Sequence, residues 1–101
     1  MNNIELNESR TVSVGYINKV CRRALKSEVY DCRDTNCMMM LFEFLTQRNI
    51  GFQLNYHPHF SRFVFQIKIY TGGEVPHLFK GKHEKPPVAA ALALMQAVEE
   101  S

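Results

Sequence analysis

Residues 62–70 (Arg-Phe-Val-Phe-Gln-Ile-Lys-Ile-Tyr) decide how the rest of this chain can fold. Every second side chain from position 63 onward is large and apolar, and the positions between them include glutamine and lysine. This period of two predicts a β-strand whose apolar face is formed by Phe63, Phe65, Ile67 and Ile69. Because one apolar sheet face must be covered, the strand also implies helices packed against it.

Two shorter strands are expected beside it. Residues 52–56 alternate at the same period, and Pro58 marks a turn before residue 62 because proline cannot donate to a strand ladder. Residues 71–73 form the next turn, and residues 75–80 are expected as a third strand. Pro76 favours an edge position for that strand.

Helical spacing appears before and after these strands. A first helix is expected from Ser13 to Lys26, with Ser13 as its N-cap. A second follows Asp34 or Thr35 and ends near Asn49, with Gly51 able to adopt the left-handed conformation. Pro86 and Pro87 open a third helix, in which the alanines allow close approach to a sheet. The buried stripe expected on this last helix comprises Val88, Ala91, Leu92, Met95 and Val98.

The elements together predict an α+β fold of order α-α-β-β-β-α. Two N-terminal helices precede a three-stranded antiparallel sheet, and the C-terminal helix packs on one face of that sheet. Residues 1–12 are polar and are expected to form an N-terminal arm, with a short strand as the alternative. Residues 13–101 are expected to form a single α+β domain. Residues 81–85 are expected as a polar loop. The predicted core comprises Leu41, Leu45, Phe63, Phe65, Ile67, Leu92 and Met95.

The composition is that of an ordinary globular domain. The chain has 101 residues, of which 46% are apolar and 22% are charged, so it can bury enough apolar surface to fold. No apolar run approaches the roughly 20 residues that cross a bilayer. The three cysteines and the absence of a secretory signal favour the cytoplasm and a reducing compartment.

The charge is unevenly distributed, although the net charge is only +2. Residues 48–85 contain six basic and two acidic side chains and therefore carry a net +4, while residues 1–47 contain six of each. A basic and aromatic surface is a usual ingredient of protein and RNA interfaces. The candidate binding residues are Arg62, Lys68, Lys80, Lys82 and Lys85.

The sequence predicts neither a zinc site nor a catalytic cysteine. Zinc could use cysteine and histidine, but the spacing of Cys21, Cys32 and Cys37 with His57 and His59 matches no standard structural site. Cys32 could act as a nucleophile, yet nothing in the sequence provides a base and an orienting group for it. We therefore predict no metal, no cofactor and no enzymatic activity.

Two families resemble this sequence. Tyr30-Asp31-Cys32-Arg33-Asp34-Thr35 before a helix, followed by strands and by the run Lys85 to Leu94, resembles the alpha-beta-alpha sandwich domain of small phage proteins. That resemblance covers residues 30–99 and implies a phage origin, and hence action in the host cytoplasm. Thr35 to Ser101 is also similar to the double-stranded RNA-binding domain, which runs helix, three antiparallel strands, helix. The RNA-binding family has lysines at the start of its last helix, where this chain has Pro86, Pro87 and Val88.

These features predict a protein that acts by binding. The first resemblance favours a host protein as the partner, with inhibition of a host defence system as one form of that role. The alternative is a module that binds duplex RNA. No membrane association is expected, and the sequence gives no oligomeric state.

Overall fold

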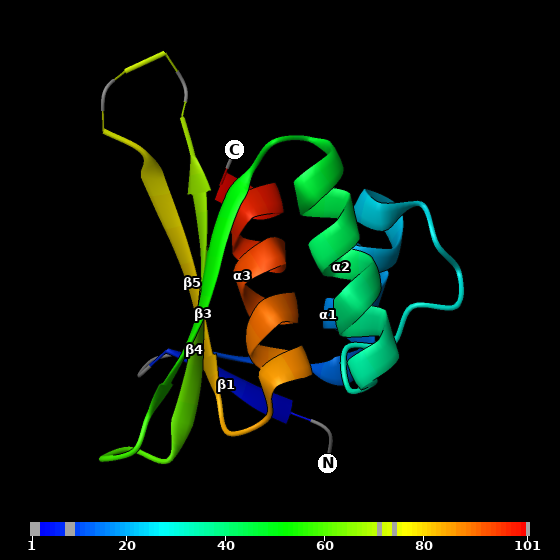
Figure 1. Ribbon diagram of the computed structural model, residues 1–101. Helices are drawn as coiled ribbons and strands as arrows, with labels where there is room; N and C mark the ends of the chain where they lie inside the picture. Colours follow the sequence, from blue (N-terminus) through cyan, green and yellow to red (C-terminus); the bar gives the residue numbers. More distant parts are fainter. Residues whose placement is uncertain (1–2, 8–9, 71, 74, 101) are drawn as a thin grey trace.

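The computed structural model describes residues 3–7, 10–70, 72–73 and 75–100. It contains a two-stranded and a three-stranded antiparallel sheet and three helices, which confirms the α+β class (Figure 1). The elements are β1 (Asn3–Asn7), β2 (Arg10–Ser13), α1 (Val14–Leu25), α2 (Thr35–Gln47), β3 (Gly51–His57), β4 (Arg62–Ile69), β5 (His77–His83) and α3 (Pro86–Glu100).

The predicted element order was wrong at the N-terminus. The polar segment before α1 forms a β-hairpin of β1 and β2, so the order is β-β-α-α-β-β-β-α. Ile4 and Val12 face each other in this hairpin and are both buried, because they join the main apolar core. Ile4, Leu6 and Val12 are too few apolar side chains for the sequence to decide between an arm and a short strand.

The chain forms three layers, with α3 in the middle (Figure 1). One side of α3 packs on β4 and β5, and the other side packs on α1 and α2. This position explains why α3 is buried over most of its circumference, as expected for a helix that is apolar all round. The predicted buried stripe was therefore too narrow, because Leu94, which lies outside it, is also buried. Val98, which was predicted to be buried, is 41% exposed.

The helix ends follow their local sequence. The Ser13 hydroxyl accepts a hydrogen bond from the Tyr16 amide at 3.1 Å, and the Asp34 carboxylate accepts one from the Asn36 amide at 2.8 Å. The Ser13 cap was predicted, and for α2 the structure selects Asp34 from the two predicted candidates, Asp34 and Thr35. The left-handed residue after α2 is Asn49, with φ of 56°, and not Gly51, which begins β3 instead. Asparagine tolerates this conformation better than most residues with a side chain.

The main sheet has the strand order β3-β4-β5, so β4 is central and β5 is an edge strand, as Pro76 indicated. However, β5 runs from His77 to His83, beyond the predicted end at Lys80. The predicted loop at residues 81–85 is therefore wrong for Gly81 to His83. Gly81 lies in this extension of β5 close to α3, and a Cβ there would lie 2.1 Å from the Ala89 carbonyl oxygen, so the position needs glycine.

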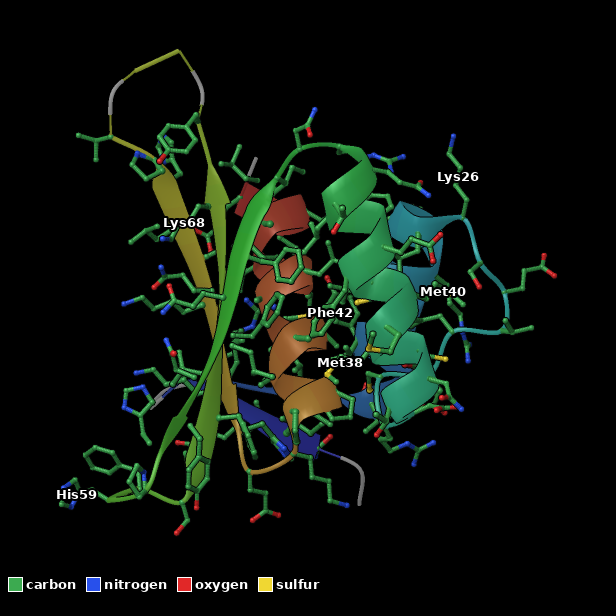
Figure 2. The ribbon with its side chains drawn as sticks, in the orientation of Figure 1. Lys26, Met38, Met40, Phe42, His59 and Lys68 are labelled. Atoms are coloured by element: carbon green, nitrogen blue, oxygen red, sulfur yellow. The ribbon has the colours of Figure 1, made fainter. Side chains whose placement is uncertain are left out.

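The predicted core is confirmed with one exception. Phe65, Ile67, Leu41, Leu45, Leu92 and Met95 are all fully or almost fully buried, and Phe63 is only half-buried at the side of the core. Phe65 stacks with Phe42 at a centroid distance of 5.5 Å and with Phe52 at 5.6 Å, and Phe42 lies between α2 and the sheet (Figure 2). Within the described residues, no helix is long and apolar enough to cross a membrane.

Candidate binding surface

The outer sheet face is the side of β3, β4 and β5 that points away from α3. The strand register brings its side chains into cross-strand rows, because alternate residues of a strand share one face. One row is Gln53, Gln66 and Lys80. The next is Asn55, Val64 and Lys82. The whole face comprises Gly51, Gln53, Asn55, His57, Arg62, Val64, Gln66, Lys68, Leu78, Lys80 and Lys82.

An open depression of about 690 Å³ lies on this face. Val64 and Phe60 provide its apolar lining, and Phe60, in the turn after β3, is 73% exposed. The other lining residues carry basic, imidazole or amide groups. The depression is lined by Asn55, His57, Phe60, Arg62, Val64, Gln66, Lys80 and Lys82.

The outer sheet face is basic. It carries Arg62, Lys68, Lys80 and Lys82, and none of the three strands β3, β4 and β5 contains an acidic residue. Glu5 of β1 approaches Arg62 with an N–O distance of 3.6 Å. Both side chains of this pair are about half exposed, so the pair contributes little stability. Among the residues that the structure describes, Lys68, Lys80 and Lys82 form no ion pair.

The structure brings three of the five predicted residues together. Arg62, Lys80 and Lys82 line the same depression. Lys68 lies on the same face but outside the depression, with its aliphatic carbons within 4.0 Å of the position a Gly51 Cβ would take (Figure 2). Lys85 follows β5 in the short connection to α3, where its amide donates to His83 Nδ1 at 3.0 Å, and it does not line the depression.

Arg62 and Lys68 lie on the central strand of the sheet. His59 lies at the tip of the β3–β4 turn and not on the outer sheet face (Figure 2). Phe60 and Asn55 were not predicted as site residues. The alternation in residues 51–57 places Asn55 opposite the apolar set, but no local signal connects Phe60 to the basic residues.

The three cysteines are the side chains with the greatest potential for nucleophilic chemistry, and all three are buried. The Cys21 thiol donates to the Ala91 carbonyl at 3.6 Å, and the Cys32 amide donates to Asn18 Oδ1 at 2.8 Å. Burial raises the pKa of Cys21 to about 12, and burial followed by the Asp31 carboxylate raises the pKa of Cys32 to about 11. Both thiols are therefore protonated at neutral pH, which disfavours nucleophilic attack by Cys32.

Tyr30 lies among these thiols and is completely buried. Its hydroxyl makes no hydrogen bond of standard geometry to the described part of the chain. Burial, and then the neighbouring thiols beginning with Cys21, raise the pKa of this phenol. The surroundings are those of a packed interior, in which cysteine behaves as a small apolar residue.

The described residues contain no group of three or more histidine, cysteine, aspartate or glutamate side chains that could hold a metal ion. His57 and the three cysteines also lie on different sides of the fold, since His57 belongs to the outer sheet face and the cysteines are in the interior. The absence of a bound metal or cofactor stays a prediction.

Comparisons with protein-family models, with curated proteins and with solved structures found no match to this chain. The two family resemblances drawn from the sequence therefore rest on its motifs alone.

Proposed function

We propose that this protein acts by binding a second protein that carries an acidic surface, and that the outer sheet face is the contact. The observation that supports this most is the combination of charge and exposure on that face. Four cations lie on a sheet surface that none of the described helices covers, and its three strands contain no acidic residue.

The chemistry of the face suits a protein partner. Val64 and the exposed ring of Phe60 provide apolar area that contact would bury, and the amides of Asn55 and Gln66 can hydrogen-bond. Lys80 and Lys82 would mainly steer an acidic partner toward the face and accelerate association. A surface of this kind binds without any catalytic group.

Duplex RNA is the alternative partner, and the start of α3 argues against it. Pro86 and Pro87 have no N–H to offer a phosphate, and Pro87 is buried. Lys80 and Lys82 belong to the sheet face opposite α3, so they cannot supply the missing cations at that helix start. A basic sheet surface can still contact a phosphate backbone, and the experiment below includes RNA for that reason.

The phage-like motif extends the proposal to the partner's origin. On that resemblance alone, the chain is a phage-encoded protein that occupies a surface of a host protein in the host cytoplasm. Inhibition of a host defence system is one consequence such binding could have.

The test compares two variants with the same change of charge. Lys80→Ala/Lys82→Ala removes two cations from the depression, whereas Lys19→Ala/Lys26→Ala removes two exposed cations from α1 and its C-cap. Partners are captured from host lysate with the wild-type protein, and association rates are then measured at several salt concentrations. We expect the face variant to associate about tenfold more slowly at low salt and to lose salt dependence, while the α1 variant behaves as wild type.

The same variants are titrated with duplex RNA. An RNA-binding role predicts that the slope of log affinity against log salt decreases by about one unit for each phosphate contact removed. Lys85→Ala serves as a third variant, and we expect it to match the α1 control because Lys85 lies outside the depression. Equal association rates for the face and α1 variants would contradict the assignment of the outer sheet face.

A further inference from the structure

The two edges of the main sheet are protected very differently. The β5 edge carries Lys80 and Lys82, and the side chain of Gln96 from α3 donates a hydrogen bond to the Lys80 carbonyl oxygen. Lysines and capped backbone groups are common means of preventing an edge strand from pairing with another chain. These features disfavour strand addition at the β5 edge.

The β3 edge lacks such protection. Its seven residues include no lysine, arginine, aspartate, glutamate or proline. Beyond its ladder with β4, the described residues add one backbone hydrogen bond, from the Phe60 amide to the His57 carbonyl at the end of the strand. Figure 1 shows β3 nearest the viewer, with no described segment along its free side. A long, uncharged and open edge strand is a template for pairing.

We propose that two copies of this chain pair antiparallel through their β3 edges and form one continuous six-stranded sheet. The strand is self-complementary about Leu54. In that register Leu54 meets Leu54 of the second copy, Phe52 meets Tyr56, Gln53 meets Asn55, and Gly51 meets His57. In this register all seven residues of each β3 strand pair with the other copy. Sliding one strand by two residues in either direction would leave only five residues of each strand paired.

The pairing keeps like side chains on like faces. Phe52, Leu54 and Tyr56 lie on the face toward the helices, where Phe52 already stacks on Phe42 at 5.0 Å. Tyr56 is 52% exposed, and the ring of the second copy's Phe52 would lie opposite it. Aromatic and amide pairs across antiparallel strands are stabilising, and no like charges face each other in this register.

The basic residues do not oppose this pairing. They lie on β4 and β5, so β3 of both copies separates them. Strands are spaced about 4.8 Å apart, which places the two β4 strands about 14 Å from each other. This separation exceeds the screening length of about 8 Å at physiological ionic strength, so repulsion between the two basic surfaces is weak.

The experiment is a charge-swap pair on the exposed positions of β3. Gln53→Lys/Asn55→Lys places lysine opposite lysine at two pairs of the proposed ladder, and Gln53→Glu/Asn55→Glu does the same with glutamate. Both positions are solvent-exposed, so the fold should be retained, which circular dichroism checks. Asn36→Lys/Gln47→Lys on exposed positions of α2 is the control with the same added charge.

Sedimentation equilibrium is measured over a range of concentrations. We expect wild type and the α2 control to dimerise equally, and each charged variant alone to dimerise about tenfold more weakly or worse. Mixing the lysine and glutamate variants should restore a dimer, because every altered pair is then of opposite sign. Wild-type protein that stays monomeric at about 1 mM overturns the proposal. A dimer that neither charged variant weakens overturns it too, and neither result depends on the proposed binding partner.

Discussion

The backbone of Gly81 in β5 lies directly against the backbone of Ala89 in α3. A Cβ on Gly81 would lie 2.1 Å from the Ala89 carbonyl oxygen and 2.6 Å from the Ala93 amide nitrogen. These neighbours are backbone atoms of a helix, so they cannot rotate away as the end of a long side chain can. The distance between the sheet and the middle layer is therefore set by the absence of a side chain at one position.

The first prediction follows from this contact. Gly81→Ala should lower the free energy of unfolding by about 3 kcal/mol or more, because α3 must move away from β5 to admit the methyl group. Gly51→Ala is the matched control in the same sheet, since its Cβ would be 3.6 Å from the nearest atom, and it should change stability by less than about 1 kcal/mol. Urea denaturation measures both. Equal stability of the two variants would show that α3 and β5 are not this close.

The second prediction concerns the aromatic centre of the core. Phe65→Ala should destabilise the fold by about 3–5 kcal/mol, because the ring is fully buried and its removal leaves a cavity between α2 and the sheet. Phe60→Ala removes the same atoms from a ring that is 73% exposed, so its effect should stay within about 0.5 kcal/mol. Thermal unfolding of both variants provides the comparison, and similar melting temperatures would contradict the assignment of Phe65 to the core.

The third prediction concerns Asn18, a buried polar residue of α1. Its Oδ1 accepts the hydrogen bond of the Cys32 amide, and it thereby fixes the connection between α1 and α2. Asn18→Ala should cost about 1–3 kcal/mol because it leaves that buried amide without a partner. Asn36→Ala, an exposed change on α2, is the control and should be close to neutral. Hydrogen exchange of the Cys32 amide should also become faster only in Asn18→Ala.

The fourth prediction is a loss of stability at alkaline pH. The pKa of Cys21 is near 9.0 when the chain is unfolded and about 12 when it is folded, so between these values the folded state binds more protons. Stability must then fall as pH rises from about 9 to about 12, by up to about 1.4 kcal/mol per pH unit for this thiol. Below pH 9 both states are protonated and the thiol contributes no pH dependence.

Cys21→Ala is the variant that isolates this effect. It should be less stable at neutral pH because a buried atom is lost, yet its stability should fall less steeply above pH 9 than that of wild type. Denaturation curves collected between pH 8 and pH 11 would show the difference. Parallel pH profiles for the two proteins would mean that the Cys21 thiol ionises as readily in the folded state as in the unfolded chain.

Much of the fold was predictable because it depends on local patterns. The alternation in β4 and the N-caps at Ser13 and Asp34 each involve residues close in sequence. The β1–β2 hairpin and the last part of β5 were not predictable in this way. Gly81 resembles a turn residue locally, and only the approach of α3, eight residues further along the chain, shows why glycine continues the strand there.

The candidate site was predictable only in part, for a related reason. Lys80 and Lys82 are separated by one residue, so a longer strand would have placed both on one face. Their position beside Arg62 depends on the register between β4 and β5, in which Val64 faces Lys82. The register between two strands joined by seven residues, 70–76, is a tertiary property. Lys85, which continues the same basic run, therefore could not be separated from the surface by sequence alone.

The central position of α3 also constrains how the chain is made. Residues 86–100 fill the space between β4 and β5 on one side and α1 and α2 on the other, so the apolar surfaces that face α3 have no other partner. In a chain synthesised only as far as Lys85, those surfaces would stay accessible to water or to chaperones. We therefore expect completion of α3 to be the step that lets the domain fold as one unit.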